Sequence, residues 1–331
     1  MILKENELLL RRRLRVAGIR DNKLYIGPEV VHLHITNRCN LRCRHCWYHS
    51  PDNPVHTRPA QDMPLAEFDA ILKDCADLKV DALYISAEGE PTLHPQFEQM
   101  MDHAAKFPLA LTVFTNAAFP ARLRPALLKA DRLIIDISAA DAKMYHAIHG
   151  ADHFNKVIAN IKALSRMNGA SGKDGLMSVT CIINKLNASR TGEISKLMND
   201  MGINSVDFKP MQPHAHNQDI LVPQKDQPAH CLNQPPLFKW CFQGWFYISI
   251  RLDGQISYCC YVNEMNAARL NKGSLKAAWR SLSLMKARLL GKTGQLGRKF
   301  RECPGCAFRK QNTAVLAELA RMKKNRSVHT P

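Results

Sequence analysis

The sequence predicts an α/β fold: a partial (β/α)6 barrel followed by a small C-terminal domain made of a β-hairpin and helices. Six short β-rich segments alternate with helical segments between residues 31 and 210. Such alternation is typical of parallel strands joined by right-handed crossovers. Six units are too few to close an eight-stranded barrel, so we expect an open, curved sheet. A turn signal at Asp253-Gly254 predicts the hairpin.

The elements of the barrel follow from apolar periodicity, which switches between two and 3.6 residues. The first 30 residues are expected to be an adapter segment, with a basic helix at 5–16 and a strand or hairpin at 22–27. The barrel spans 31–210, and Gly202 follows its last helix where a C-terminal stop belongs. The predicted strands are 31–36, 82–86, 110–115, 132–137, 177–183 and 205–209, and the predicted helices are 63–78, 95–107, 121–129, 154–168 and 191–201.

The last third of the chain is expected to fold as a separate unit. Residues 211–240 contain five prolines and predict a linker or an ordered loop over the barrel mouth. The small domain spans 241–331, with hairpin strands at 245–251 and 255–262. Helices at 274–290 and 313–324 follow, and the final helix is basic.

Composition and charge narrow the class of protein. The chain has 331 residues, 46% hydrophobic and 23% charged, which is typical of globular proteins. We expect a cytoplasmic protein without membrane association, because no apolar run approaches a membrane span and Leu8–Leu10 is too short for a signal peptide. The net charge is +17, and residues 266–331 hold 16 basic and 2 acidic side chains, hence +14 of it. This excess indicates either a solvated basic helix or a surface that attracts an anionic partner.

Eleven cysteines are the main chemical signal, and eight of them fall into two groups. In a reducing compartment, clustered cysteines usually hold metal rather than form disulfides. The first group is Cys39, Cys43 and Cys46, and the second is Cys241, Cys259, Cys260, Cys303 and Cys306. Of the others, Cys75 and Cys181 fall in a predicted helix and strand, where they are expected to be core residues.

The first group has the spacing Cys-x3-Cys-x2-Cys, which lets three thiolates close around one compact centre. An iron–sulfur cubane normally takes four thiolates, so three leave one iron open. An open coordination position is typical of a catalytic metal. A zinc site would need a fourth ligand, such as His45 or His49.

The second group supplies four thiolates, from Cys241, Cys259, Cys303 and Cys306, for zinc or an iron–sulfur cluster. A hairpin can bring Cys241 and Cys259 together. Adjacent strand residues point to opposite faces, so only one of Cys259 and Cys260 is expected to ligate, and the spacing favours Cys259.

Residues 30–210 resemble the radical S-adenosylmethionine (SAM) superfamily. Ile35-Thr36-Asn37-Arg38 precedes the three cysteines, and Glu88-Gly89-Glu90-Pro91 follows the second predicted strand, where the family has Gly-Gly-Glu-Pro. Thr115-Asn116, Ile137-Ser138 and Asn184-Lys185-Leu186-Asn187 follow in the family's order. The C-terminal cysteines resemble the twitch domain, a shortened SPASM auxiliary domain, because no cysteine follows Cys306.

The resemblance implies two 4Fe–4S clusters, one on Cys39, Cys43 and Cys46 and one auxiliary cluster on the second group. The open iron of the first would chelate SAM, and one electron would release a 5′-deoxyadenosyl radical that abstracts a hydrogen atom from a substrate. With four protein ligands the auxiliary cluster would transfer electrons, whereas with three its open iron could bind substrate directly. An electron donor such as flavodoxin or ferredoxin is implied.

The resemblance also implies which residues bind the cofactor. Glu90 would accept the ammonium of SAM, with Gly89 in the same loop. Asn116 and Ser138 would contact ribose or carboxylate, and Asn184 is a further candidate. His45 stands where the family often has an aromatic residue, and its ring can stack on adenine. Glu88 replaces the first glycine of the family's loop.

For the activity, we expect a peptide maturase that oxidises, cross-links or epimerises its substrate. Cys231 and Cys260, near the predicted barrel mouth, are candidate hydrogen-atom donors to a substrate radical. The alternatives are a small-molecule dehydrogenase, an RNA-modifying enzyme, and, in another class, a non-catalytic iron–sulfur or zinc scaffold that does not cleave SAM. The basic C-terminal region would suit an acidic leader, a phosphorylated substrate or nucleic acid.

Overall fold

The structure is a computed structural model, and it describes residues 5–53, 59–171, 176–223, 239–259, 266–270, 274–296 and 308–327. Within these residues, one sheet has the strand order β6-β5-β4-β3-β2-β1-β7-β8-β9. Strands β1 to β6 pair in parallel in the order of the sequence, which confirms the predicted partial barrel. These strands are β1 (Val30–His34), β2 (Ala82–Ser86), β3 (Ala110–Thr115), β4 (Arg132–Asp136), β5 (Met177–Ile183) and β6 (Val206–Pro210).

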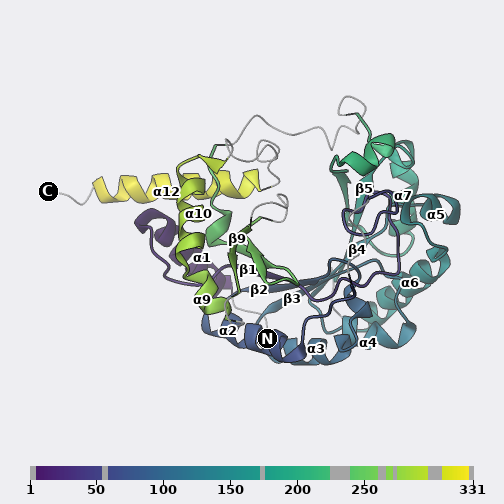
Figure 1. Ribbon diagram of the computed structural model, residues 1–331, viewed down its shortest axis with the longest axis horizontal. Helices are drawn as coiled ribbons and strands as arrows, with labels where there is room; N and C mark the ends of the chain where they lie inside the picture. Colours follow the sequence, from purple (N-terminus) through teal and green to yellow (C-terminus); the bar gives the residue numbers. More distant parts are fainter. Residues whose placement is uncertain are drawn as a thin grey trace.

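The helices lie on the outer side of the sheet, and the strands form the inner side of an open arc (Figure 1). The predicted barrel helices are all present, with ends shifted by a few residues. A further helix, α5, lies between β4 and the next predicted helix and was not predicted from the sequence. The helices are α2 (Leu65–Asp77), α3 (Phe97–Ala104), α4 (Arg124–Leu127), α5 (Ala142–His149), α6 (Phe154–Ser171) and α7 (Thr191–Asn199).

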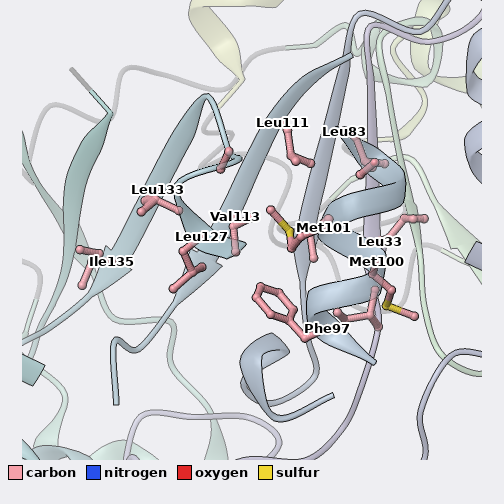
Figure 2. Packing of buried hydrophobic residues seen from close by; sticks show 14 of the residues in the cluster. Leu33, Leu83, Phe97, Met100, Met101, Leu111, Val113, Leu127, Leu133 and Ile135 are labelled. Atoms are coloured by element: carbon pink, nitrogen blue, oxygen red, sulfur yellow. The ribbon is translucent and has the colours of Figure 1, made fainter. Parts of the chain in front are cut away.

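The hydrophobic core fills the space between the sheet and these helices. Apolar residues at alternate positions along the strands, such as Leu33, Leu83 and Val113, are fully buried. They meet Phe97 and Met101 of α3, as Figure 2 shows. Burying one such side chain contributes roughly 1.5–3 kcal/mol, so this layer fixes the sheet on which the site is built.

The C-terminal strands continue the barrel sheet. β7 (Tyr247–Ile250) pairs in parallel with β1, and β8 (Gln255–Ser257) pairs antiparallel with β7, which confirms the predicted hairpin. Gly254 adopts a positive φ of 75° at its turn. A strand that was not predicted, β9 (Asn266–Arg269), pairs with β8. Hydrogen bonds between β7 and β1 join the hairpin directly to the barrel. The predicted division into separate domains at residues 210 and 241 stays a prediction.

Two other predictions are corrected. Residues 22–27 form no strand, because Asn22 takes a positive φ of 54° and Lys23 N–H donates to the Gly18 carbonyl, which ends the helix in a turn. The predicted helix 274–290 is two helices, α9 (Leu275–Trp279) and α10 (Leu282–Lys292). The break occurs because the Ser281 side chain accepts from Leu284 N–H and begins a new helix.

The N-terminal helix α1 (Glu5–Asp21) joins the barrel to the last helix, α12 (Arg309–Ser327). Arg11 and Arg15 pair with the buried Asp81 just before β2, with N–O distances of 3.0 and 2.5 Å. On its other side, Arg12 pairs with Glu318 at 2.7 Å. The two helices lie side by side in Figure 1.

Within the described part of the chain, every helix falls short of the length and apolar character that crossing a membrane demands.

Candidate functional site

The three cysteines of the first group lie on the loop that leaves the C-terminal end of β1. Several contacts hold the start of this loop. Thr36 donates to Asp62 Oδ1 at 2.6 Å, and Arg38 donates to the two oxygens of Asp62 at 3.0 Å. Glu90 N–H, from the loop after β2, donates to the Arg38 carbonyl at 2.7 Å. The strand-end loops of β1 and β2 are thus bonded to each other, as the fold class predicts.

The three thiols are partly buried and affect one another electrostatically. Burial raises the pKa of Cys39 to about 12, and it raises the pKa of Cys43 and Cys46 as well. The nearby Cys46 and Cys39 thiols raise the pKa of Cys43 further. Thiols this hard to ionise gain from a cationic centre that takes them as thiolates.

The donor set fits an iron–sulfur cluster. Backbone N–H groups are directed at the sulfurs: that of Leu41 at Cys39, at 3.5 Å, and those of Tyr48 and His49 at Cys46, both at 3.3 Å. Such hydrogen bonds stabilise cluster thiolates. Among the described residues, no three His, Cys, Asp or Glu side chains converge as ligands of a single ion. A cubane binds each of its thiolates through a separate iron, so it does not require the three sulfurs to converge on a single ion.

Glu90 and Gly89 lie beside the cysteine loop. Glu90 is 1% exposed, and its Oε1 accepts from Thr92 N–H, Thr92 Oγ1 and Thr115 Oγ1. Its Oε2 accepts from Asn116 N–H at 2.7 Å. Burial raises the pKa of Glu90, and these four donors oppose that rise. Gly89 is required sterically, since a Cβ there would lie 2.1 Å from the Arg38 carbonyl oxygen.

Asn116 bridges the loop after β3 to the cysteine loop. Its Nδ2 donates to Asn40 Oδ1 at 2.9 Å, and its Oδ1 accepts from Ala118 N–H at 2.8 Å. Asn40 in turn donates to the Ala118 carbonyl at 3.0 Å. The side chain therefore supports the loop, and its contact with the cofactor stays a prediction.

The other predicted cofactor residues are Ser138, Asn184 and the half-buried His45. Ser138 and Asn184 are both 0% exposed. Ser138 Oγ accepts from Ile182 N–H, and Asn184 Oδ1 accepts from Leu186 N–H, both at 2.9 Å. Burial lowers the pKa of His45 to about 4, which keeps its ring neutral. Their contacts with SAM also stay predictions.

His149, at the end of the unpredicted helix α5, contacts the first cysteine group. Its Nδ1 lies 3.1 Å from Cys43 Sγ, and its Nε2 accepts from Ser138 N–H at 3.1 Å. Sequence reasoning missed this residue because it missed the helix. The signal was present: Asp141 and Gly150 have the residue types of an N-cap and of a left-handed C-terminal stop.

A polar wall on the inner face of the sheet was also missed. His32 and His34 of β1 stack with ring centroids 4.9 Å apart. His32 contacts Tyr247 Oη at 2.6 Å and Ser86 Oγ at 2.5 Å, and His34 contacts Ser249 Oγ at 3.1 Å. Burial lowers the pKa of His34 to about 4 and that of His32 well below its usual value, so both rings are neutral. In the sequence, His32 and His34 alternate with the apolar Val31 and Leu33, and this alternation was the signal that the inner face of β1 is polar.

The hairpin reaches the cofactor loops through one ion pair. Arg251, just after β7, donates to Glu88 Oε1 at 3.1 Å, and its guanidinium lies 5.8 Å from the centroid of the Tyr48 ring. Glu88 is 4% exposed. The residue that replaces the family's first glycine therefore bonds the barrel loop to the C-terminal strands.

The second cysteine group is described in part. Cys241 and Cys259 are partly buried against the main core, and Cys241 N–H donates to the Gly291 carbonyl at 3.0 Å. Cys303 and Cys306 lie outside the described residues, as do the two candidate hydrogen-atom donors, Cys231 and Cys260. Their assigned roles stay predictions.

Two sequence-family models match the chain. The model of the radical SAM superfamily matches residues 33–197. The SPASM model, an iron–sulfur cluster-binding domain, matches residues 241–307. The first match contains the loops with Cys39, Cys43, Cys46 and Glu90, and the second contains all four predicted auxiliary ligands.

Among curated proteins, the antilisterial bacteriocin subtilosin biosynthesis protein AlbA of Bacillus subtilis (strain 168) is 23% identical over 205 residues, 59% of this chain and 42% of AlbA. GTP 3′,8-cyclase of Psychromonas ingrahamii is 26% identical over 188 residues, 56% of this chain and 51% of the cyclase. The chain thus spans about half the length of these relatives.

Among solved structures, Streptococcus suis SuiB bound to S-adenosylmethionine superposes with a TM-score of 0.66 at 16% identity, covering 87% of this chain and 74% of SuiB. SuiB bound to its precursor peptide SuiA gives 0.63 at the same identity, covering 87% of this chain and 73% of SuiB. This likeness extends the shared fold from the barrel into the C-terminal region.

Proposed function

The chain belongs to the radical SAM superfamily and carries a SPASM iron–sulfur domain, and we propose that it reductively cleaves SAM to abstract a hydrogen atom from a peptide. Its cofactors are 4Fe–4S clusters and SAM. The observation that carries the proposal is the bonded pair of loops that places three thiols beside Glu90.

Each residue of this loop pair has a defined task. Cys39, Cys43 and Cys46 would hold the cluster, which supplies the electron that breaks the C–S bond. Glu90 Oε2 accepts one backbone N–H and keeps capacity to accept the ammonium of SAM. Gly89, with no side chain, allows the two loops to approach. The neutral ring of His45 is available to stack on adenine.

Two relatives favour a peptide substrate. AlbA is named for the biosynthesis of a bacteriocin, and SuiB was solved with a precursor peptide. On this basis the net reaction is oxidation, cross-linking or epimerisation of a peptide. The match to GTP 3′,8-cyclase supports the alternative of a small-molecule substrate.

Incubation of the reconstituted, reduced protein with SAM and each candidate substrate in turn distinguishes a peptide substrate from a small-molecule substrate. The peptide probe is any short precursor peptide that a neighbouring gene is found to encode, and the small-molecule probe is GTP. Loss of two hydrogens from the peptide, or deuterium uptake from heavy water, supports the proposal. Turnover of GTP with an unchanged peptide would contradict it and support the alternative.

The auxiliary cluster is proposed on Cys241, Cys259, Cys303 and Cys306, as an electron acceptor for the substrate radical. Two four-iron clusters correspond to about eight irons per chain. A variant with Cys303→Ala and Cys306→Ala should lose about half of the iron. Stoichiometric zinc with one cluster's worth of iron would contradict this assignment. Flavodoxin or ferredoxin is the proposed electron donor to the protein.

The basic C-terminal region is proposed to attract an acidic segment of the substrate. The sequence of α12 contains Arg309, Lys310, Arg321, Lys323, Lys324 and Arg326, while its Glu318 is paired with Arg12. Binding of an acidic peptide should weaken steeply between about 50 and about 200 mM salt, because counterions compete with it. Binding that is flat over this range would contradict the proposal, and preferential binding of RNA of equal charge would support the RNA-modifying alternative.

A further inference from the structure

The C-terminal end of α5 is a backbone support for the cysteine loop. The N–H groups on either side of Cys43 both bond to it: Arg42 donates to the His149 carbonyl and Arg44 to the Ile148 carbonyl, each at 3.0 Å. Gly150 follows with a φ of 66°, and a Cβ there would lie 2.8 Å from the Arg42 carbonyl oxygen. The helix end and the loop are therefore in close backbone contact around the second cysteine.

The side chain of His149 adds a third contact between the helix end and this loop, at Cys43 itself, and its tautomer is fixed. Its Nε2 receives the backbone N–H of Ser138 at 3.1 Å, and a backbone N–H can only donate. Nε2 therefore carries no proton, so in the neutral ring the proton is on Nδ1. Nδ1 lies 3.1 Å from Cys43 Sγ, which makes the ring a donor to the sulfur.

The ring has little freedom to turn away from the sulfur. His149 is 1% exposed. Its ring centroid lies 4.5 Å from that of Tyr145 and 5.9 Å from that of His45, which meets it edge to face. The contacts on both nitrogens and with the two neighbouring rings fix its orientation toward Cys43.

We propose that His149 is a positioning residue that donates its Nδ1–H to the cluster thiolate of Cys43 and thereby orients this ligand and raises the reduction potential of the cluster. The reduced cluster carries more negative charge on its sulfurs, so an N–H···S bond stabilises the reduced form more than the oxidised form. The inference rests on the proposed cluster site, but it does not depend on the substrate or on SAM cleavage.

The test is a redox titration, followed by electron paramagnetic resonance, of the cluster signal that a Cys43→Ala variant lacks. His149→Phe keeps a ring and removes the donor. We expect it to lower the potential by about 59 mV, the equivalent of a tenfold shift in a one-electron equilibrium. His149→Gln, which retains an N–H donor, should recover part of the loss. The matched control is His146→Gln on the same helix, whose ring is exposed and bonds Asp152, and it should keep the wild-type potential.

A wild-type potential in His149→Phe with full iron would overturn the inference. A second measurement covers the case in which that variant does not fold. In wild-type protein labelled with ¹⁵N-histidine, pulsed resonance should detect a histidine nitrogen coupled to the reduced cluster, and the coupling should persist in His45→Phe. Absence of the coupling would also overturn the inference. Failure of SAM cleavage, by contrast, would leave the measured potential and the nitrogen coupling unchanged, and it would contradict the proposed function instead.

Discussion

Replacing Gly89 with alanine tests whether the cofactor loop and the cysteine loop need the close backbone contact seen in the structure. The added Cβ would lie 2.1 Å from the Arg38 carbonyl oxygen and 2.5 Å from its carbon, whereas ordinary contact begins at 3.4 Å. The methyl group is therefore about 1.3 Å too close to the oxygen (3.4 − 2.1). Neither side can yield as a flexible side chain would, because both are backbone and Glu90 N–H bonds the same oxygen at 2.7 Å.

The cost of Gly89→Ala follows from these contacts. A forced backbone shift costs about 1–3 kcal/mol, and loss of the Glu90–Arg38 hydrogen bond adds about 1 kcal/mol. We expect the free energy of unfolding of the cluster-free protein to fall by about 2–4 kcal/mol. We also expect the reconstituted protein to hold less iron, because Arg38 directly precedes Cys39.

Urea denaturation and iron analysis measure the two effects. The matched control is Gly169→Ala in α6, where a Cβ meets nothing within 4 Å. There the change should stabilise the protein by about 0.5–1 kcal/mol, because alanine loses less backbone entropy in a helix. A Gly89→Ala variant with wild-type stability and wild-type iron would refute the close approach of the two loops.

Two further predictions concern the frame of the site and its thiols. Asp81→Ala leaves the buried guanidiniums of Arg11 and Arg15 without their carboxylate, so the free energy of unfolding measured in urea should fall by about 3–5 kcal/mol. Asp102→Ala breaks an exposed pair with Lys129 and should lower it by at most about 1 kcal/mol. Equal small losses in the two variants would contradict the buried network. Burial raises the pKa of Cys39 to about 12, so in cluster-free protein this thiol stays protonated at neutral pH and becomes reactive only as the pH rises. Alkylation followed by mass spectrometry should therefore show Cys39 reacting far more slowly than glutathione at about pH 8, and cluster assembly, which releases the thiol protons, should weaken as the pH falls; rapid alkylation at that pH would be the opposite result.

Local sequence patterns predicted much of the fold because the barrel strands and most helices have long apolar periodicity. Phe68, Ile71 and Leu72 mark one face of α2, for example, and all three are fully buried. Helix α5 was not predicted because it has eight residues, too few for a helical period to be distinctive. Its ends were readable, however, from Asp141 and Gly150.

Long-range contacts explain the rest of what the sequence did not reveal. The parallel pairing of β7 with β1 joins residues more than 200 positions apart, as in Val30 with Tyr247, and no local pattern encodes that register. No local pattern encodes the contact of His149 with Cys43 or the ion pair of Arg251 with Glu88 either, since both join residues more than 100 positions apart. The motifs around Cys39–Cys46 and Glu90 were visible because both lie directly after strands whose ends meet in a parallel sheet.

Production of 5′-deoxyadenosine tests the central claim most directly. Protein reconstituted with iron and sulfide without oxygen, reduced with dithionite and given SAM, should release 5′-deoxyadenosine and methionine. Cys43→Ala should abolish the product, whereas Cys75→Ala, which removes a core thiol in α2, should retain it. No 5′-deoxyadenosine from wild-type protein with a full complement of iron would contradict the account.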